Sequence, residues 1–343
     1  MATDIQTIPP VPELSRKDFI TSNDVRWCPG CGDYAILNSL QRTFPDLGVP
    51  RENFVVVSGI GCSSRFPYYM DTYGFHSIHG RAPTVATGIK VANPDLSVWI
   101  VTGDGDGLSI GGNHMLHLLR RNVNVTVLLF NNRIYGLTKG QYSPTSPVGT
   151  KTKTTPSGSI DHPIHPLLFA LGAEATFIAR TVDNNPKHMV ETFKAAHEHQ
   201  GVSFVEILQN CVIFNDAAWD PVYGKENRDQ QMLFLEADKP LLFGKNKEKG
   251  IRLNGLTPEI VDAATAAPGE ILTHHPEQSS PLYSQMLATL GLPAFPTPIG
   301  VIRQIQRPTY DSLIHNQVKE SQAKRGTGTW RELLHGSSTW TVE

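Results

Sequence analysis

The residues best suited to chemistry are an acidic glycine turn, a pair of asparagines and four cysteines. The turn is Gly103-Asp104-Gly105-Asp106-Gly107, and it follows an apolar segment, residues 98–101. A second apolar segment, residues 123–130, ends at Asn131-Asn132, so 25 residues (106–130) separate the first Gly-Asp-Gly from the asparagines. A strand before each motif and a helix between them would form a βαβ unit.

In such a unit the carboxyl ends of both strands meet at one edge of the sheet, where open α/β sheets bind ligands. Asp104 and Asn132 would emerge there as oxygen donors suited to Mg²⁺ holding a diphosphate. The glycines let backbone N–H groups approach phosphate oxygens. An ordinary glycine turn of a dinucleotide-binding unit is the alternative, but two acidic residues in the turn argue against the G-x-G-x-x-G pattern.

The four cysteines, Cys28, Cys31, Cys62 and Cys211, all fall in segments expected to be loops. Their spacing differs from that of compact zinc fingers, in which two short pairs build a small module. A 4Fe–4S cluster held by thiolates from distant loops is our first hypothesis. A zinc site comes second, and a Cys28/Cys31 redox pair with two inert thiols comes third. The residues alone give no strong margin among the three.

Alternating strand and helix patterns surround these motifs and predict an α/β fold with a mostly parallel sheet flanked by helices. Strands are expected at residues 54–57, 75–78, 98–101, 123–130, 175–179 and 203–208, and helices at residues 34–44, 84–92, 163–171 and 186–199. Ser63 and Ser64 could cap a short helix after the cysteine-bearing loop. The long polar segment from residue 133 to about 161 is expected to be a loop that covers a substrate or cofactor.

Three regions are predicted from these patterns. Residues 1–25 would form an N-terminal arm, residues 26–215 the α/β domain with the cofactor sites, and residues 216–343 an extension packed on the core or on a partner subunit. The extension is expected to be irregular, with helical pieces near residues 257–266 and 281–290.

Composition narrows the functional class. A net charge of −2 and a pI near 6.7 give no reason to expect a nucleic-acid or anionic-membrane partner. No apolar run has transmembrane length, and the first residues lack the apolar core of a signal peptide, so a cytoplasmic protein is expected. Charged residues make up 18% of the chain, and 29 Gly plus 25 Pro suit a loop-rich enzyme or a subunit that buries surface against partners.

Five motifs in matching order resemble the β (thiamine diphosphate-binding) subunit of 2-oxoacid:ferredoxin oxidoreductases, most of all the 2-oxoglutarate type. They are WCPGCG (27–32), SGIGCSSR (58–65), IHGRAPTVATGIKVANP (78–94), the GDGD…NN pair, and YGLTKGQYSPTS (135–146). The resemblance covers roughly residues 24–216. It implies a thiamine diphosphate-binding fold and CoA-dependent oxidative decarboxylation of a 2-oxoacid, with electrons passed to ferredoxin.

The resemblance also implies roles for individual residues. Asp104, Asn132 and the carbonyl of Ile134 would bind Mg²⁺, and Cys28, Cys31, Cys62 and Cys211 would hold one 4Fe–4S cluster. The thiamine diphosphate site would comprise Ile60, Gly61, Cys62, Ser63, His79, Gly103, Asp104, Gly105, Asp106, Asn132 and Ile134. For His79, a hydrogen bond to a phosphate oxygen and a purely structural role are equally favoured.

Arg65, Leu137 and Lys139 are the candidates for binding the substrate. In relatives that act on 2-oxoglutarate, a lysine at the place of Lys139 is thought to meet the distal carboxylate, which favours 2-oxoglutarate over pyruvate or another 2-oxoacid. No glutamate here lies in a motif that would activate thiamine, so the resemblance implies that an α subunit supplies it, in an α2β2 assembly. Two alternative functions remain: another thiamine enzyme, such as a non-oxidative decarboxylase or synthase, and a non-catalytic zinc-stabilised interaction subunit.

Overall fold

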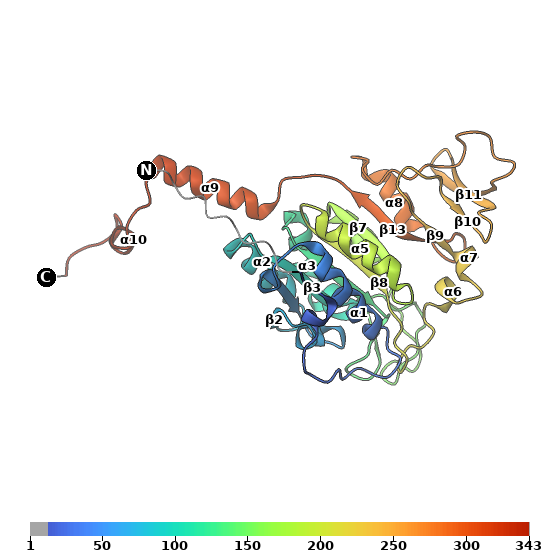
Figure 1. Cartoon of the computed structure of the whole chain (residues 1–343), viewed down its shortest axis with the longest axis horizontal. Coiled ribbons are helices and arrows are strands. Elements are labelled where there is room, and N and C mark those ends of the chain that lie inside the picture. The colour runs from blue at the N-terminus through green and yellow to red at the C-terminus, as the bar shows by residue number, and fades with distance from the viewer. Residues whose placement is uncertain (1–12, 343) are drawn as a thin grey trace.

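An eight-stranded sheet forms the centre of the computed structural model, which describes residues 13–342 (Figure 1). The strand order is β2-β1-β3-β4-β8-β7-β13-β9. All neighbouring strands are parallel except β13 and β7, which are antiparallel. The strands are β1 (Phe54–Ser58), β2 (Tyr73–His76), β3 (Ser97–Gly103), β4 (Thr126–Asn131), β7 (Phe177–Val182), β8 (Ser203–Leu208), β9 (Met232–Phe234) and β13 (Thr297–Gln304).

Helices cover both faces of this sheet, which explains why its central strands are apolar on both sides. One face packs against α1 (Asp33–Thr43) and α5 (Pro186–Glu198), and the other against α2 (Ala82–Ala92), α3 (Gly112–Arg121), α4 (Pro166–Gly172) and α8 (Pro281–Thr289). Successive side chains of β4 alternate between the two cores, with Val127 and Leu129 in one and Leu128 and Phe130 in the other. The predicted α/β fold with a mostly parallel sheet is confirmed.

Shorter elements complete the chain. They are the hairpin β5 (Ile134–Tyr135) and β6 (Gln141–Tyr142), the three-stranded sheet β10 (Leu242–Phe243), β11 (Lys249–Asn254) and β12 (Thr257–Asp262), and the helices α6 (Asp220–Tyr223), α7 (Arg228–Gln231), α9 (Tyr310–Arg325) and α10 (Trp330–His335). Four 3-10 helices, Arg16–Phe19, Phe44–Leu47, Arg51–Asn53 and Ser63–Tyr68, and one π-helical turn, Asp106–Ile110, lie between them.

The C-terminal third is more regular than the sequence predicted. The helical piece expected near residues 257–266 is wrong: residues 257–262 form β12, which pairs antiparallel with β11 across a two-residue turn that begins at Gly255. Gly255 has φ +62°, a conformation that hairpin turns require and that glycine adopts without strain. The helix expected near residues 281–290 is present as α8. Two strands from this third, β9 and β13, also join the central sheet.

The N-terminal end of the described chain packs on the body, whereas the C-terminal end extends away from it. Within the predicted N-terminal arm, residues 1–12 lie outside the described residues, while Phe19 is buried with its ring 5.4 Å from that of Phe44 and 5.6 Å from that of Phe54. At the other end, α9 and α10 extend away from the body (Figure 1). No helix among residues 13–342 is both long and apolar enough to cross a membrane.

Candidate cofactor and cluster site

Loops at the carboxyl ends of β1, β2, β3 and β4 meet at one edge of the sheet. They surround a cavity of about 90 Å³. Every residue predicted to bind thiamine diphosphate lines it: Ile60, Gly61, Cys62, Ser63, His79, Gly103, Asp104, Gly105, Asp106, Asn132 and Ile134. The lining also includes Tyr135, Gly136 and Thr138, which the sequence analysis did not assign, and Leu137, which it assigned to the substrate.

Asp104 is placed as a ligand for a cation. Its side chain is buried, and its Oδ2 atom accepts hydrogen bonds from the hydroxyls of Ser143 and Thr145, the latter at 2.6 Å. Burial raises the pKa of this carboxyl, while the two hydroxyl donors lower it. A buried carboxylate held in this way is stabilised by a divalent cation, so the donor chemistry fits Mg²⁺. Ser143 and Thr145 belong to the long segment expected to cover the site.

The two asparagines after β4 have different surroundings. Asn131 is buried, donates to Glu206 Oε1 at 2.7 Å and accepts from Thr145 at 2.9 Å. Asn132 lines the cavity, and its Oδ1 accepts from the backbone N–H of Ile134 at 3.1 Å. Asn132 is therefore the asparagine with access to a ligand, whereas Asn131 fixes the end of the strand.

Asp106 holds the surrounding loops together. Its carboxylate accepts hydrogen bonds from the backbone N–H groups of Ile60 at 3.0 Å and Gly80 at 2.7 Å, and from the hydroxyl of Thr102 at 2.6 Å. It also lies 2.5 Å from His79 Nδ1. These contacts direct the carboxylate into the protein, so Asp106 fixes the loops after β1 and β2 around the cavity. The interaction through Nδ1 leaves Nε2 as the ring nitrogen of His79 that can reach a phosphate, and that role remains a prediction.

All four cysteines line a second cavity of about 250 Å³ beside the first, and we call this second cavity the thiol cavity. Cys28 and Cys31 precede α1, Cys62 follows β1 and Cys211 follows β8. A Cβ atom on Gly136 would lie 3.5 Å from the Sγ atom of Cys211 and 3.6 Å from that of Cys62, so glycine keeps the space between these thiols open.

The thiols need positive charge to ionise in this cavity. Burial raises the pKa of Cys31 and Cys211 and brings that of Cys62 to about 12. The charges of Asp33 and of neighbouring thiolates raise the pKa values of Cys31 and Cys62 further. Burial also raises the pKa of neighbouring Asp33 to about 7. Iron supplies the missing charge when thiolates ligate a cluster. All four thiols line the same cavity, and four thiolates are the usual ligands of a 4Fe–4S cluster. This donor set fits a multi-iron cluster.

The two cavities share a wall made of Cys62, Asn132, Gly136 and Leu137, which line both. The cationic residues predicted to bind substrate, Arg65 and Lys139, line the thiol cavity and not the smaller cavity, whereas Leu137 lines both. Arg65 donates to the backbone carbonyl of Arg26 at 2.8 Å. Their role in substrate binding stays a prediction.

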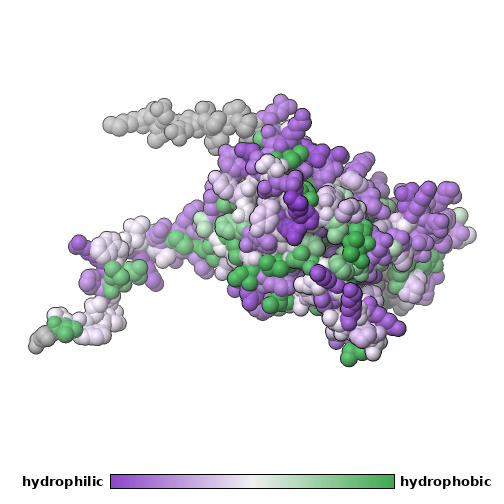
Figure 2. Space-filling view, turned by 90° about the horizontal axis from the view of Figure 1, so that it is seen from below, coloured by the Kyte–Doolittle hydropathy of each residue, from purple (hydrophilic) through white to green (hydrophobic). Residues whose placement is uncertain are grey.

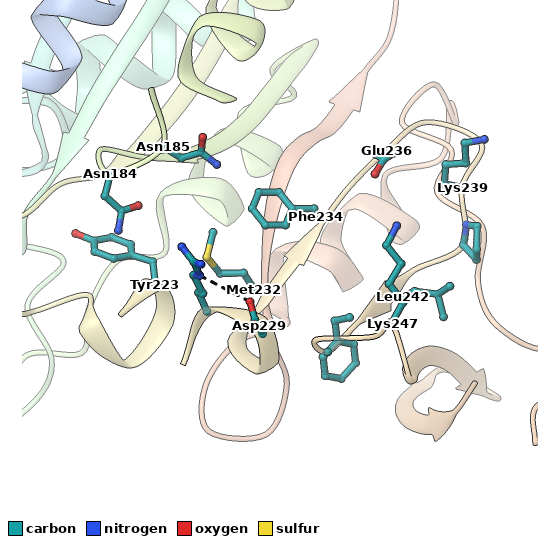
Figure 3. A pocket seen from close by; sticks show the side chains of 14 residues that line it. Asn184, Asn185, Tyr223, Asp229, Met232, Phe234, Glu236, Lys239, Leu242 and Lys247 are labelled. Atoms are coloured by element: carbon teal, nitrogen blue, oxygen red, sulfur yellow. Dashed lines mark ion pairs between the residues drawn. The ribbon is translucent and has the colours of Figure 1, made fainter. Parts of the chain in front are cut away.

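A larger cavity, about 830 Å³, lies elsewhere, between the segment after β7 and the β9–β10 region (Figure 3). Asn184, Tyr223, Phe234 and Lys239 are among the residues that line it (Figure 3). It shares no lining residue with the other two cavities and contains none of the motif residues. Size alone therefore does not identify the candidate site.

Comparisons with known proteins agree with this geometry. Residues 59–207 match the family model described as thiamine pyrophosphate enzyme, C-terminal TPP binding domain. The chain is 53% identical to the 2-oxoglutarate oxidoreductase subunit KorB of Mycobacterium tuberculosis over 330 residues, which covers 95% of this chain and 88% of the relative. It is 43% identical to the 2-oxoglutarate synthase subunit KorB of Methanocaldococcus jannaschii over 54% of this chain and 68% of the relative.

A solved structure is similar over nearly the whole chain. It is the 2-oxoglutarate:ferredoxin oxidoreductase from Magnetococcus marinus with 2-oxoglutarate, coenzyme A and succinyl-CoA bound, with a TM-score of 0.75 and 34% identity. The alignment covers 98% of this chain and 99% of that one. The motifs, the fold and these relatives lead to one conclusion: the chain belongs to the KorB family of 2-oxoacid:ferredoxin oxidoreductase β subunits.

Proposed function

We propose that the chain is the β subunit of a 2-oxoglutarate:ferredoxin oxidoreductase. With its α subunit it would convert 2-oxoglutarate and coenzyme A to succinyl-CoA and CO₂, and pass two electrons to ferredoxin. The observation that carries the proposal is the wall shared by the thiol cavity and the smaller cavity, which we call the diphosphate cavity. The wall carries the proposal because this reaction requires an electron acceptor beside the thiamine. The names of the relatives support the choice of 2-oxoglutarate.

Each cavity would hold one cofactor. Asp104, Asn132 and the carbonyl of Ile134 would bind Mg²⁺ and through it the diphosphate, and Cys28, Cys31, Cys62 and Cys211 would ligate a 4Fe–4S cluster. Bound thiamine diphosphate supplies the electron sink for decarboxylation. The protein's part is to hold the diphosphate, orient the thiamine towards the shared wall and keep water out of the buried loops.

The α subunit would complete the site. None of the described residues that line the diphosphate cavity is a glutamate, and we assign the group that activates thiamine to the partner. The chain alone should therefore bind cofactors without turning over substrate. The α2β2 assembly and the use of ferredoxin as acceptor belong to the same proposal.

Metal analysis of anaerobically purified protein tests the cluster. We expect roughly four iron and four sulfide per chain, because a cubane is held by four thiolates. A broad visible absorption should fade on reduction with dithionite. Zinc in place of iron, in a colourless protein, would instead favour the non-catalytic interaction subunit. Iron-free protein that still binds thiamine diphosphate would favour a non-oxidative thiamine enzyme.

A further inference from the structure

Gln209 connects the two cofactor sites through its side-chain amide. It is the first residue after β8, and it is 1% exposed. Its Oε1 accepts a hydrogen bond from Asn132 Nδ2 at 2.8 Å, and its Nε2 donates to Cys31 Sγ at 3.3 Å. The same Nε2 donates to the carbonyl of Asn210 at 2.6 Å. One amide thus contacts a proposed magnesium ligand and a proposed cluster ligand.

We propose that Gln209 is a positioning residue for both sites, an inference that rests on the proposed function. An amide side chain has one donor and one acceptor end. Because Oε1 accepts from Asn132 Nδ2, the asparagine's amide is oriented with its oxygen on the opposite side. One lone pair of that oxygen accepts from the N–H of Ile134, and the second is left for the metal. Partners that orient a metal ligand in this way contribute about 10–100-fold to metal affinity.

The other end of the amide acts on the cluster. An N–H group that donates to a cysteine sulfur stabilises negative charge there, and hydrogen bonds to sulfur are among the factors that set cluster reduction potentials. The bond from Gln209 to Cys31 therefore raises the potential of the cluster. Gln209 makes the cluster a better electron acceptor and keeps the metal ligand in place at the same time.

The surrounding backbone fixes Gln209 in this position. Its N–H donates to the carbonyl of Asn131 at 3.1 Å, at the end of β4. A Cβ atom on Gly32 would collide with the Gln209 side chain, so the turn after Cys31 packs directly on it. Strand β8, the turn after β4 and the cysteine loop before α1 all converge on this one side chain.

Two substitutions in the assembled αβ complex separate the two contacts. Gln209→Met keeps the length of the side chain and removes both hydrogen bonds. Gln209→Glu keeps an acceptor for Asn132 and removes the donor to Cys31. Gln41→Met is the matched control, because Gln41 is a buried glutamine that donates to two backbone carbonyls and lines neither cavity.

The readouts are the cluster's midpoint potential, from an EPR-monitored redox titration, and the affinity for thiamine diphosphate with Mg²⁺, from calorimetry. We expect Gln209→Met to lower the potential and to weaken cofactor binding about 10-fold or more. Gln209→Glu should lower the potential and bind the cofactor within a few-fold of wild type, by the same reasoning. Gln41→Met should change neither property.

An iron-loaded Gln209→Met complex with unchanged potential or unchanged affinity overturns the proposal. If Gln209→Met does not assemble, an unchanged potential in Gln209→Glu overturns it as well. Failure of the proposed function gives a different result, because wild-type protein would then lack the iron signal or fail to bind thiamine diphosphate.

Discussion

At the scale of single residues, neighbouring side chains of the same type have different contacts in the site. Asp104 and Asp106 stand two positions apart in one turn, but Asp104 is held by two hydroxyls beside the cavity and Asp106 is held by loop backbone. Asn131 and Asn132 are adjacent, but only Asn132 lines the cavity. Chemistry in this site depends on which way each side chain points, and spacing alone does not determine that.

The proposed metal site depends most on Asp104. Asp104→Asn keeps the shape of the side chain and its contacts with Ser143 and Thr145, but removes the charge that a divalent cation needs. We expect binding of thiamine diphosphate with Mg²⁺ to weaken about 100-fold or more, at the upper end of typical losses for metal-site changes. Calorimetry of the iron-loaded protein measures this. Asp161→Asn, an exposed carboxylate on the covering segment, is the control, and tight binding by Asp104→Asn would contradict the assignment.

Substrate choice is tested at Lys139. If its ammonium group meets the distal carboxylate of 2-oxoglutarate, Lys139→Ala should raise KM for 2-oxoglutarate about 10-fold or more, the loss of an ion pair of 1.4 kcal/mol or more. Activity towards pyruvate should change little. The assay uses the reconstituted complex with both substrates, and Lys151→Ala controls for removing an exposed charge from the same segment. An unchanged preference would reject this role for Lys139.

At the scale of elements, the strands and the loops at their ends could be predicted more fully than the contacts between loops. Apolar runs such as residues 54–57 and 203–208 identified the central strands, and the rule for parallel sheets brought Asp104 and Asn132 to one edge. No such pattern marks Gly136, Gln209 or Ser143, because their roles come from loops that meet only in the folded chain. The hairpin of β11 and β12 is predictable from Asn254-Gly255, because an Asn-Gly pair between strands favours a tight hairpin turn.

The hairpin after Asn132 is expected to control whether the cluster fits. Gly136→Val would place a branched side chain between Cys62 and Cys211. We expect iron per chain to fall below about half of the wild-type value, because a full cubane needs all four thiolates. Iron and sulfide analysis is the measurement. Gly291→Val serves as control, since a Cβ atom there meets no other atom within 4 Å, and full iron loading of Gly136→Val would show that the cluster lies elsewhere.

At the scale of the whole molecule, the C-terminal third has two parts. Strands β9 and β13 extend the central sheet, and α8 covers one of its faces, so this part of the chain is integral to the fold. Beyond the first turns of α9 the chain leaves the body (Figure 1). The start of α9 is anchored where Asp311 accepts from the backbone of Asn124 and His315 lies 3.0 Å from the carbonyl of Val91.

The C-terminal arm, residues 316–342, carries exposed apolar residues away from the body (Figure 2). They are Val318, Trp330, Leu333, Leu334, Trp340 and Val342, between 48% and 85% exposed. Several large apolar side chains gathered on one exposed segment are typical of a protein–protein contact. We propose that the arm packs on the α subunit, as expected for residues beyond the α/β domain.

Removing residues 327–343 tests the role of the arm. Because residues 327–342 are exposed and extend away from the body (Figure 1), the shortened chain should keep its cofactors and its fold. Its affinity for the α subunit should fall about 10-fold or more, since burying even one large apolar side chain contributes about 1.5–3 kcal/mol. Native mass spectrometry over a dilution series measures the assembly. Replacing only the two tryptophans, Trp330 and Trp340, with serine should give a smaller loss, and unchanged assembly in both variants would contradict the proposal.

The wall of Cys62, Asn132, Gly136 and Leu137 also limits how the chain can change in length. Surface loops usually accept extra residues at little entropic cost, which is why related proteins differ most in their loops. Here an inserted residue between Asn132 and Gly136, or between Ser58 and Cys62, would thicken the barrier between the two cavities. Electron tunnelling slows exponentially with distance. If the two proposed cofactors occupy these cavities, such an insertion would therefore slow electron transfer even in a chain that folds and binds both. The number of residues in these two loops is therefore as constrained as their identity.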